Sequence, residues 1–351
     1  RERTMMNEFL IADMHCDTLS ASLAGSPSGR EADLRTQDTQ VNFEKMKQSG
    51  YLLQNFAAFV DLDNAENPLE EALRMADLFY RQLDAHSDLI APAVSWKDIE
   101  RNRSEGKVSA ILTLEEGGIC RGDPAFLSIL YRLGARMMTL TWNYENELGF
   151  PNFDLHRPLP GISPDQESHD PVAPGDSFFE DLSGFGLKKQ GFCFLEEMER
   201  LGMIIDVSHL SDAGFYDVLN HTRKPFVASH SNARGLWPAK RNLTDDMIRR
   251  LANRGGAAGI NFCMAFLGRP EPGADFLDQA VRHMKYLTNL GGEDFVGLGS
   301  DFDGIEPYGD FRDCTVMPQL IDRMKKAGFS YTQIEKICSK NVLRVYREVL
   351  G

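Results

Sequence analysis

The chain has 351 residues, of which 42% are hydrophobic, and it is therefore long enough to bury a sizeable core. Its 38 Lys and Arg residues stand against 52 Asp and Glu residues, and the formal net charge of −14 argues against nucleic acid and anionic membrane surfaces as partners. The sequence shows no transmembrane segment and no signal peptide, and its six cysteines are scattered singly, so we expect a cytoplasmic protein with reduced thiols.

Short apolar runs alternate with amphipathic helical segments from one end of the chain to the other, which is typical of βα units and a parallel sheet. Eight strands are predicted, at residues 9–15, 52–60, 109–115, 136–142, 202–209, 225–231, 257–263 and 295–301. Helices are predicted among others at residues 68–84, 189–202, 244–255, 275–291 and 330–350. We expect the last of these to pack outside the barrel.

Eight strands favour a closed (β/α)8 TIM barrel, with a doubly wound sheet as the alternative. Because no linker or repeat divides the sequence, we expect a single domain over residues 1–351. Residues 143–183 are rich in Pro, Gly and acidic residues and predict a long loop insertion after the fourth strand. This loop would leave the face of the barrel where active sites lie, either as a lid or subunit contact or as a passive insertion.

Polar side chains of the kind that bind metals follow several of these strands. His15 and Asp17 stand two residues apart at the end of the first strand, so both point to one side while Cys16 points to the other. The third strand ends at Glu115 and Glu116, which must point in opposite directions, so that only one can reach the barrel mouth.

The later strands end in the same way. The fifth strand ends in DVSH at His209, the sixth in ASHS at His230, and the eighth in GLGSDFDG, with Asp301 at its edge. Each residue alone has a structural explanation, but their shared placement at successive strand ends predicts one site. Two imidazoles and carboxylates suit zinc, which can activate water and polarise a carbonyl group.

These segments together resemble the membrane or renal dipeptidase family of zinc peptidases (family M19), a branch of the amidohydrolase-like barrels. The carriers are ADMHCD (12–17), LTLEEGG (112–118), LGARMMTLTWN (133–143), LGMIIDVSHLSD (201–212), ASHSNARGLWPAKRNLTDD (228–246) and GLGSDFDG (297–304). The resemblance covers nearly the whole chain. It implies a zinc-dependent dipeptidase and, at the level of the family, a homodimer.

Carried over by motif, the resemblance implies two zinc ions per chain. His15 and Asp17 would hold one ion, and His209 and His230 the other. Glu115 is the expected bridge, because it keeps an ungapped distance to TLTWN, whereas an alignment on the glycines would favour Glu116.

The remaining roles follow from the same motifs. Asp301 would carry the proton between a metal-bridged hydroxide and the leaving amine, and Arg241 in AKRNL would bind the free carboxylate of a dipeptide. Dipeptides with a C-terminal D-residue are included in this expectation.

Two positions depart from the family pattern. Trp142 stands where many members have a histidine that is thought to touch the substrate carbonyl, so Asn143 or Asn146 would have to replace it if the metals do not suffice. Phe266 lies near the position of a substrate-binding tyrosine, and we expect Arg241, Trp142, Asn143 and Phe266 to contact the substrate. These changes leave open a zinc amidohydrolase for a cyclic amide, lactone or β-lactam. A non-catalytic barrel that binds a small molecule or metal is a second alternative.

Overall fold

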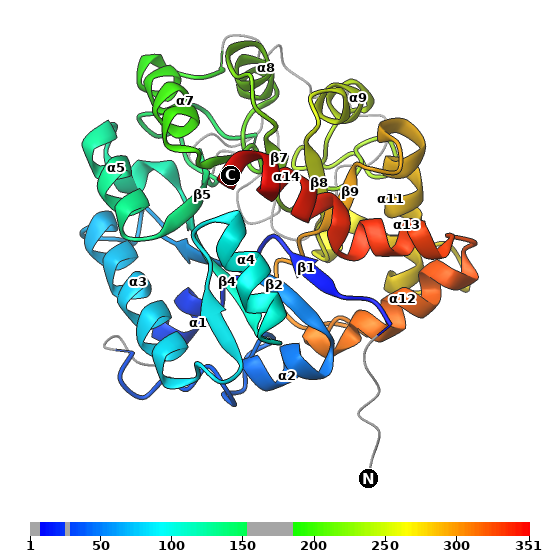
Figure 1. The fold of residues 1–351 in the computed structure, drawn as a ribbon. Helices are drawn as coiled ribbons and strands as arrows, with labels where there is room; N and C mark the ends of the chain where they lie inside the picture. The colour runs from blue at the N-terminus through cyan, green and yellow to red at the C-terminus, as the bar shows by residue number, and fades with distance from the viewer. Residues whose placement is uncertain (1–7, 25–28, 153–184) are drawn as a thin grey trace.

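A computed structural model describes residues 8–24, 29–152 and 185–351 of the chain. Its nine parallel strands form one sheet in the order β2-β1-β9-β8-β7-β6-β5-β4-β3, and β2 also pairs with β4, which closes eight of the strands into a ring (Figure 1). The predicted (β/α)8 barrel is therefore confirmed. The strands are β1 (Ile11–Asp13), β2 (Tyr51–Phe59), β3 (Ile90–Pro92), β4 (Val108–Glu115), β5 (Ala135–Thr139), β6 (Ile204–Asp206), β7 (Val227–Ala228), β8 (Ala257–Ile260) and β9 (Val296–Leu298).

Strand β3 was not predicted from the sequence. It pairs with the first residues of β4, from Val108 to Ala110, whereas β5 pairs with the later residues of β4, from Leu112 to Glu115. The strand is three residues long and ends at Pro92, which has no backbone N–H to donate to a ladder. It adds to the edge of β4 without entering the ring.

Helices surround the barrel in Figure 1. The predicted helix at 244–255 is α9, which begins after Thr244, whose side chain accepts a hydrogen bond from the Met247 N–H. The α-helices are α1 (Thr18–Ala24), α2 (Phe43–Gln48), α3 (Pro68–Ala85), α4 (Trp96–Ser104), α5 (Pro124–Arg132), α7 (Lys189–Leu201), α8 (Asp212–His221), α9 (Asp245–Asn253), α10 (Met264–Leu267), α11 (Phe276–Gly291), α12 (Met317–Lys326), α13 (Tyr331–Glu335) and α14 (Asn341–Leu350). Short 3-10 helices, η1 (Gly117–Cys120) and η2 (Cys314–Val316), and a π-helical turn, η3 (Lys336–Lys340), complete them.

The last predicted helix, 330–350, differs from the expectation. It consists of α13, the π-helical turn and α14, and α14 does not lie on the outer wall. It crosses the amino-terminal end of the barrel, where it packs against the apolar side chains that the strands direct inward (Figure 1). The fully buried Tyr346 of α14 reaches far enough to accept a 2.6 Å hydrogen bond from the Asn55 side chain on β2. The sequence pattern showed an apolar stripe but not which surface covers it.

The predicted insertion at 143–183 is described only over residues 143–152, because 153–184 lie outside the described residues. None of the helices in the described part of the chain is both long and apolar enough to cross a membrane. All six cysteines are free thiols, as expected from their spacing.

Candidate metal centre

The carboxyl-terminal end of the barrel gathers the polar residues that follow its strands. Parallel strands all finish at this edge, so residues that are far apart in the sequence meet there. The last residue of β4 and residues shortly after β1, β6, β7 and β9 converge on one buried space. They are His15, Asp17, Glu115, His209, His230 and Asp301.

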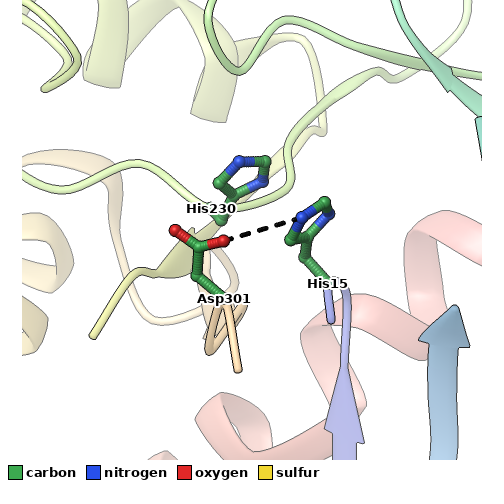
Figure 2. A group of neighbouring side chains, drawn as sticks. All are labelled: His15, His230 and Asp301. Carbon is green, nitrogen blue, oxygen red and sulfur yellow. Dashed lines mark ion pairs between the residues drawn. The ribbon is translucent and has the colours of Figure 1, made fainter. Parts of the chain in front are cut away.

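His15 is the centre of a first group. Its Nε2 atom lies 3.2 Å from Asp17 Oδ2 and 3.2 Å from Glu115 Oε2. Figure 2 shows Asp301 beside it, with Oδ1 at 3.7 Å from the same nitrogen. Cys16 points the other way, since its thiol contacts the Asn55 carbonyl oxygen.

A second group forms on the other oxygen of Glu115. His209 Nε2 lies 3.3 Å and His230 Nε2 lies 3.6 Å from Glu115 Oε1. The His230 ring also stacks on the His15 ring with 3.9 Å between the centroids (Figure 2). Glu115 thus directs one carboxylate oxygen to each group, which is the geometry of a carboxylate shared by two cations.

The hydrogen bonds of the two later histidines fix where their protons lie. His209 Nδ1 lies 2.8 Å from Asn143 Oδ1, which can only accept, so Nδ1 carries the proton. The Ser229 hydroxyl donates to the Asp206 carboxylate and therefore accepts from His230 Nδ1, at 2.6 Å. Both Nε2 atoms consequently present lone pairs, and they face each other across 3.0 Å. Such an arrangement requires a cation or a proton between them.

The pKa shifts in this buried space also favour bound cations. Burial alone would lower the pKa of His15, but the carboxylates of Glu115 and Asp17 raise it well above its ordinary value. Burial and the charge of Glu115 raise the pKa of Asp17 to about 8, and burial raises the pKa of Asp301 to about 6. Several acidic groups therefore crowd a largely buried space, and bound cations would offset their mutual repulsion.

The donor set fits two divalent cations. Three sets of ligand atoms lie within 4.8 Å of one another: His15, Asp17 and Glu115; Glu115, His209 and His230; and His15, His230 and Asp301. In addition, Asp17 Oδ1 is buried and has no hydrogen-bond partner in the described part of the chain. Nitrogen and carboxylate ligands without thiolates are a set that zinc accepts.

The backbone is strained at the same place. His209 and Asp301 have φ angles of 68° and 66°, in the left-handed region that residues other than glycine rarely adopt. Gly299 allows β9 to approach the end of β7, because a Cβ atom there would lie 1.8 Å from the Ser229 carbonyl oxygen. Strain of this kind is common where side chains must be aimed at a ligand.

Glu116 has a separate place. Its carboxylate accepts hydrogen bonds from the Gly118 N–H at 2.6 Å, from the Trp142 N–H at 2.8 Å and from the Asn146 side chain. Burial raises its pKa to about 7. The two adjacent glutamates thus point in opposite directions, as the strand alternation predicts, and Glu115 is the one that reaches the cluster.

The cluster opens into a cavity of about 490 Å³. Trp142, Asn143 and Phe266, which were predicted to bind substrate, line it together with Asp17, Glu115, His209 and Asp301. Asn143 also contacts His209 Nδ1, so it supports a candidate ligand in addition to facing the cavity. Asn146, the other proposed replacement for the missing histidine, is buried against Glu116.

Arg241 is not among the described residues that line this cavity. Its guanidinium donates to the His230 carbonyl oxygen at 3.1 Å and to the Ser231 hydroxyl at 3.2 Å, and it lies over the Phe266 ring. Its Nε atom is buried and has no partner among the described residues. Arg241 is therefore a buried cation next to the cluster that still has N–H groups to donate.

Sequence reasoning missed the residues that support the cluster from behind. Asp206 and Ser229 orient His230, as described above. Asn261, which follows β8, donates to Asp301 Oδ2 at 2.9 Å, and Asp13 on β1 accepts hydrogen bonds from the backbone of His15 and Ser300. A polar residue within or directly after a buried apolar strand was the available signal, since such a residue needs a partner.

Comparison with known proteins places the chain in a family. The model of the family described as membrane dipeptidase (peptidase family M19) matches residues 1–153 and 169–350. An uncharacterised Klebsiella pneumoniae protein encoded in the pqqA 5′ region is 34% identical over 283 residues, which cover 78% of this chain and 96% of that protein. The dipeptidase aclJ of Aspergillus oryzae is 30% identical over 323 residues, covering 88% of this chain and 70% of that protein.

Solved structures agree with this assignment. The crystal structure of dipeptidase AC, an M19 metallopeptidase, has a TM-score of 0.82 at 26% identity and covers 98% of this chain and 100% of its own. A metallopeptidase from Rhodobacter sphaeroides, solved with a phosphinate mimic of the dipeptide L-Ala-D-Ala, has a TM-score of 0.81 at 25% identity and covers 97% and 99%. The chain belongs to the membrane dipeptidase family, peptidase family M19.

Proposed function

We propose that the protein is a zinc-dependent dipeptidase that hydrolyses the peptide bond of dipeptides and holds two zinc ions per chain. The observation that carries this proposal is the position of Glu115, with one oxygen toward His15 and the other toward His209 and His230. His15 and Asp17 would hold one ion, and the other two histidines the second. Zinc ions bound there would polarise the scissile carbonyl group and lower the pKa of the attacking water.

Asp301 is the residue that we expect to move the proton. It lies at the cluster edge, faces the cavity, and receives a hydrogen bond from Asn261 that fixes its carboxylate. From this position it would accept a proton from the water and return it to the nitrogen of the leaving amine. If Asp301→Asn retained wild-type turnover with full metal content, this role would have to be abandoned.

Arg241 is proposed to bind the free carboxylate of the substrate. Its planar guanidinium suits a carboxylate, and its buried Nε atom has no partner among the described residues. A carboxylate bound at this point would select short peptides, because a longer chain has no charged terminus at the required distance from the scissile bond.

The relatives support dipeptides as the substrate class. The Aspergillus relative carries the name dipeptidase, and the Rhodobacter structure contains a mimic of L-Ala-D-Ala. We therefore include dipeptides with a C-terminal D-residue among the substrates of this chain. Trp142, Asn143 and Phe266 would line the substrate cavity.

Two further properties are part of the proposal. A homodimer is expected from the family resemblance, and light scattering at micromolar concentration would test it. A cytoplasmic location is supported by the six free thiols, which suit a reducing compartment, and fractionation of the source cells would test it.

The function is tested with a panel of L,L- and L,D-dipeptides. Turnover should disappear after treatment with a chelator and return when zinc is added, with two zinc ions measured per chain by elemental analysis. Anomalous scattering at the zinc edge would locate both ions beside Glu115. Turnover that a chelator leaves unchanged, or none with zinc present, would refute the proposal.

A further inference from the structure

We propose that Phe59 and Trp142 form a subsite for the side chain of the substrate's N-terminal residue, and that it selects large apolar side chains. This inference rests on the proposed dipeptidase function. The two rings, which we call the aromatic wall, both line the cavity that opens from the metal cluster. Neither ring is fully buried, so each has a surface available for contact with a ligand.

The aromatic wall has a defined geometry. The Phe59 and Trp142 rings pack edge to face, with 4.9 Å between their centroids and 64° between their planes. Trp142 also lies 6.3 Å from the His209 ring, measured between centroids, so the wall stands directly beside the cluster. Phe59 is the last residue of β2 and is in register with Glu115 on β4, which places it level with the candidate bridging carboxylate.

Trp142 is held in place from behind. Its backbone N–H donates to the buried Glu116 carboxylate, which also ties the segment around Asn146 to the end of β4. The buried Tyr144 ring also packs against Trp142, with 5.3 Å between centroids. A ring that is fixed by its backbone and by a neighbouring aromatic residue can form a rigid pocket wall, which loses little conformational entropy when a ligand binds.

The position of the wall indicates which end of a dipeptide it contacts. In the ring of eight strands, β2 and β7 are opposite each other: β2-β4-β5-β6-β7 runs one way and β2-β1-β9-β8-β7 the other. Arg241 is anchored to His230 and Ser231, which follow β7. A dipeptide whose carboxylate lies toward Arg241 and whose scissile carbonyl lies at the cluster therefore directs its N-terminal residue toward Phe59.

The chemistry of the wall sets the preference. Aromatic faces offer apolar area and ring-to-ring contact, and they give a carboxylate nothing to compensate its lost hydration. A phenylalanine or leucine side chain would bury apolar surface there, whereas an alanine methyl group would leave most of the wall uncovered. Trp142 therefore offers the substrate an apolar surface that suits recognition of an apolar side chain.

The test compares catalytic efficiency within one series, Phe-Gly, Leu-Gly, Ala-Gly and Asp-Gly, with zinc-loaded protein. The ratio of kcat/KM for Phe-Gly to that for Ala-Gly is the main readout, because the fraction of folded or metal-loaded enzyme cancels from it. We expect wild-type protein to favour Phe-Gly by at least tenfold. Phe59→Ala and Trp142→Ala should each reduce the ratio by roughly tenfold, equivalent to about 1.4 kcal/mol.

Three controls make the result specific. Trp142→Phe should keep most of the preference, and Trp96→Phe, on α4 at the opposite end of the barrel, should leave the ratio unchanged. The reversed dipeptides Gly-Phe and Gly-Ala should differ little. A wild-type ratio near one, a ratio within twofold of wild type in both alanine variants, or a preference seen only with Gly-Phe would overturn the subsite. Absence of turnover with every dipeptide would instead reject the dipeptidase function, and the subsite with it.

Discussion

The two ends of the barrel are built from the same strands but have opposite compositions. At the amino-terminal end, inward-facing residues of the strands form an apolar cluster that α14 closes. At the carboxyl-terminal end, the continuations of these strands carry histidines and carboxylates, two of them with left-handed backbone angles. The amino-terminal end satisfies the usual rules of packing. The carboxyl-terminal end violates them, because it buries charged groups and holds residues with strained backbone angles.

This difference indicates a division of tasks. Apolar packing at the closed end supplies stability that the polar end does not, since buried charges cost free energy unless they are paired or bound to metal. A substitution at the polar end should therefore affect chemistry more than folding. A substitution at the closed end should have the reverse effect. Four experiments test how strictly the two ends are separated.

The largest effect is expected for Glu115→Gln. The variant loses the charge that both histidine groups share, so kcat/KM should fall on the order of 10³-fold or more and the zinc content should drop. The adjacent Glu116→Gln is the matched control and should retain metal, since Glu116 bonds to Gly118, Trp142 and Asn146. Metal loss in the control, with metal retained in the first variant, would reverse the assignment of the bridge.

At the closed end, Tyr346→Ala should lower the free energy of unfolding by about 3–5 kcal/mol, because it empties a fully buried aromatic site and leaves Asn55 without its partner. Tyr331→Ala on α13 is the control, as its side chain is 53% exposed. Chemical denaturation measures both. The folded fraction of Tyr346→Ala should still bind zinc at the wild-type stoichiometry, and loss of metal would show that the ends are coupled.

A smaller effect is expected for Ser229→Ala, which removes the hydroxyl between Asp206 and His230 Nδ1. Loss of such a supporting contact typically weakens metal binding by about 10- to 100-fold. Competition with a chromophoric chelator would measure the affinity, and Ser229→Thr should restore much of it. Ser104→Ala on the exposed end of α4 should change nothing. An unaltered affinity in Ser229→Ala would show that His230 does not depend on this contact.

The smallest effect concerns His283, which supports the polar end from α11. Its Nδ1 accepts from the Ala233 N–H and its Nε2 donates to the Leu267 carbonyl, and burial lowers its pKa from 6.5 to about 4. At pH values between about 4 and 6.5, His283 binds a proton in the unfolded chain but not in the folded chain. Unfolding free energy should therefore fall with decreasing pH in this window, by at most about 1.4 kcal/mol per pH unit.

His283→Gln should flatten this slope, whereas His221→Gln, at a more exposed position on α8, should preserve it. Urea denaturation at several pH values measures the slopes. Equal slopes in wild type and His283→Gln would mean that His283 is protonated in the folded protein or that other groups dominate.

Much of the fold could be predicted because the barrel strands are buried apolar runs that the sequence shows directly. Strand β3 could not, since three residues that end in proline carry no recognisable pattern. The location of α14 was also hidden, because an apolar stripe shows that a helix face is buried but not which surface covers it. Apolar periodicity in the sequence predicts a helix or strand and its buried face, but it does not predict the element against which that face packs.

The candidate site follows the same division. His15, Asp17 and the later histidines could be proposed because each ends an apolar run. The sequence favoured Glu115 over Glu116 only through its distance to TLTWN, and the fold shows that Glu115 is the one that faces the cavity. The supporting roles of Asp206 and Asn261 depend on contacts between neighbouring strands, and a single sequence does not contain that information.

The closing of the barrel by α14 also bears on biosynthesis. Residues 341–350 are translated after all nine strands, so every strand leaves the ribosome before the helix that covers their apolar interior exists. Until that helix docks, side chains such as Met14 and Ile111 would remain exposed to water at the amino-terminal end of the barrel. Nascent chains should thus expose an aggregation-prone apolar surface late in synthesis. Chaperones would matter most at this stage.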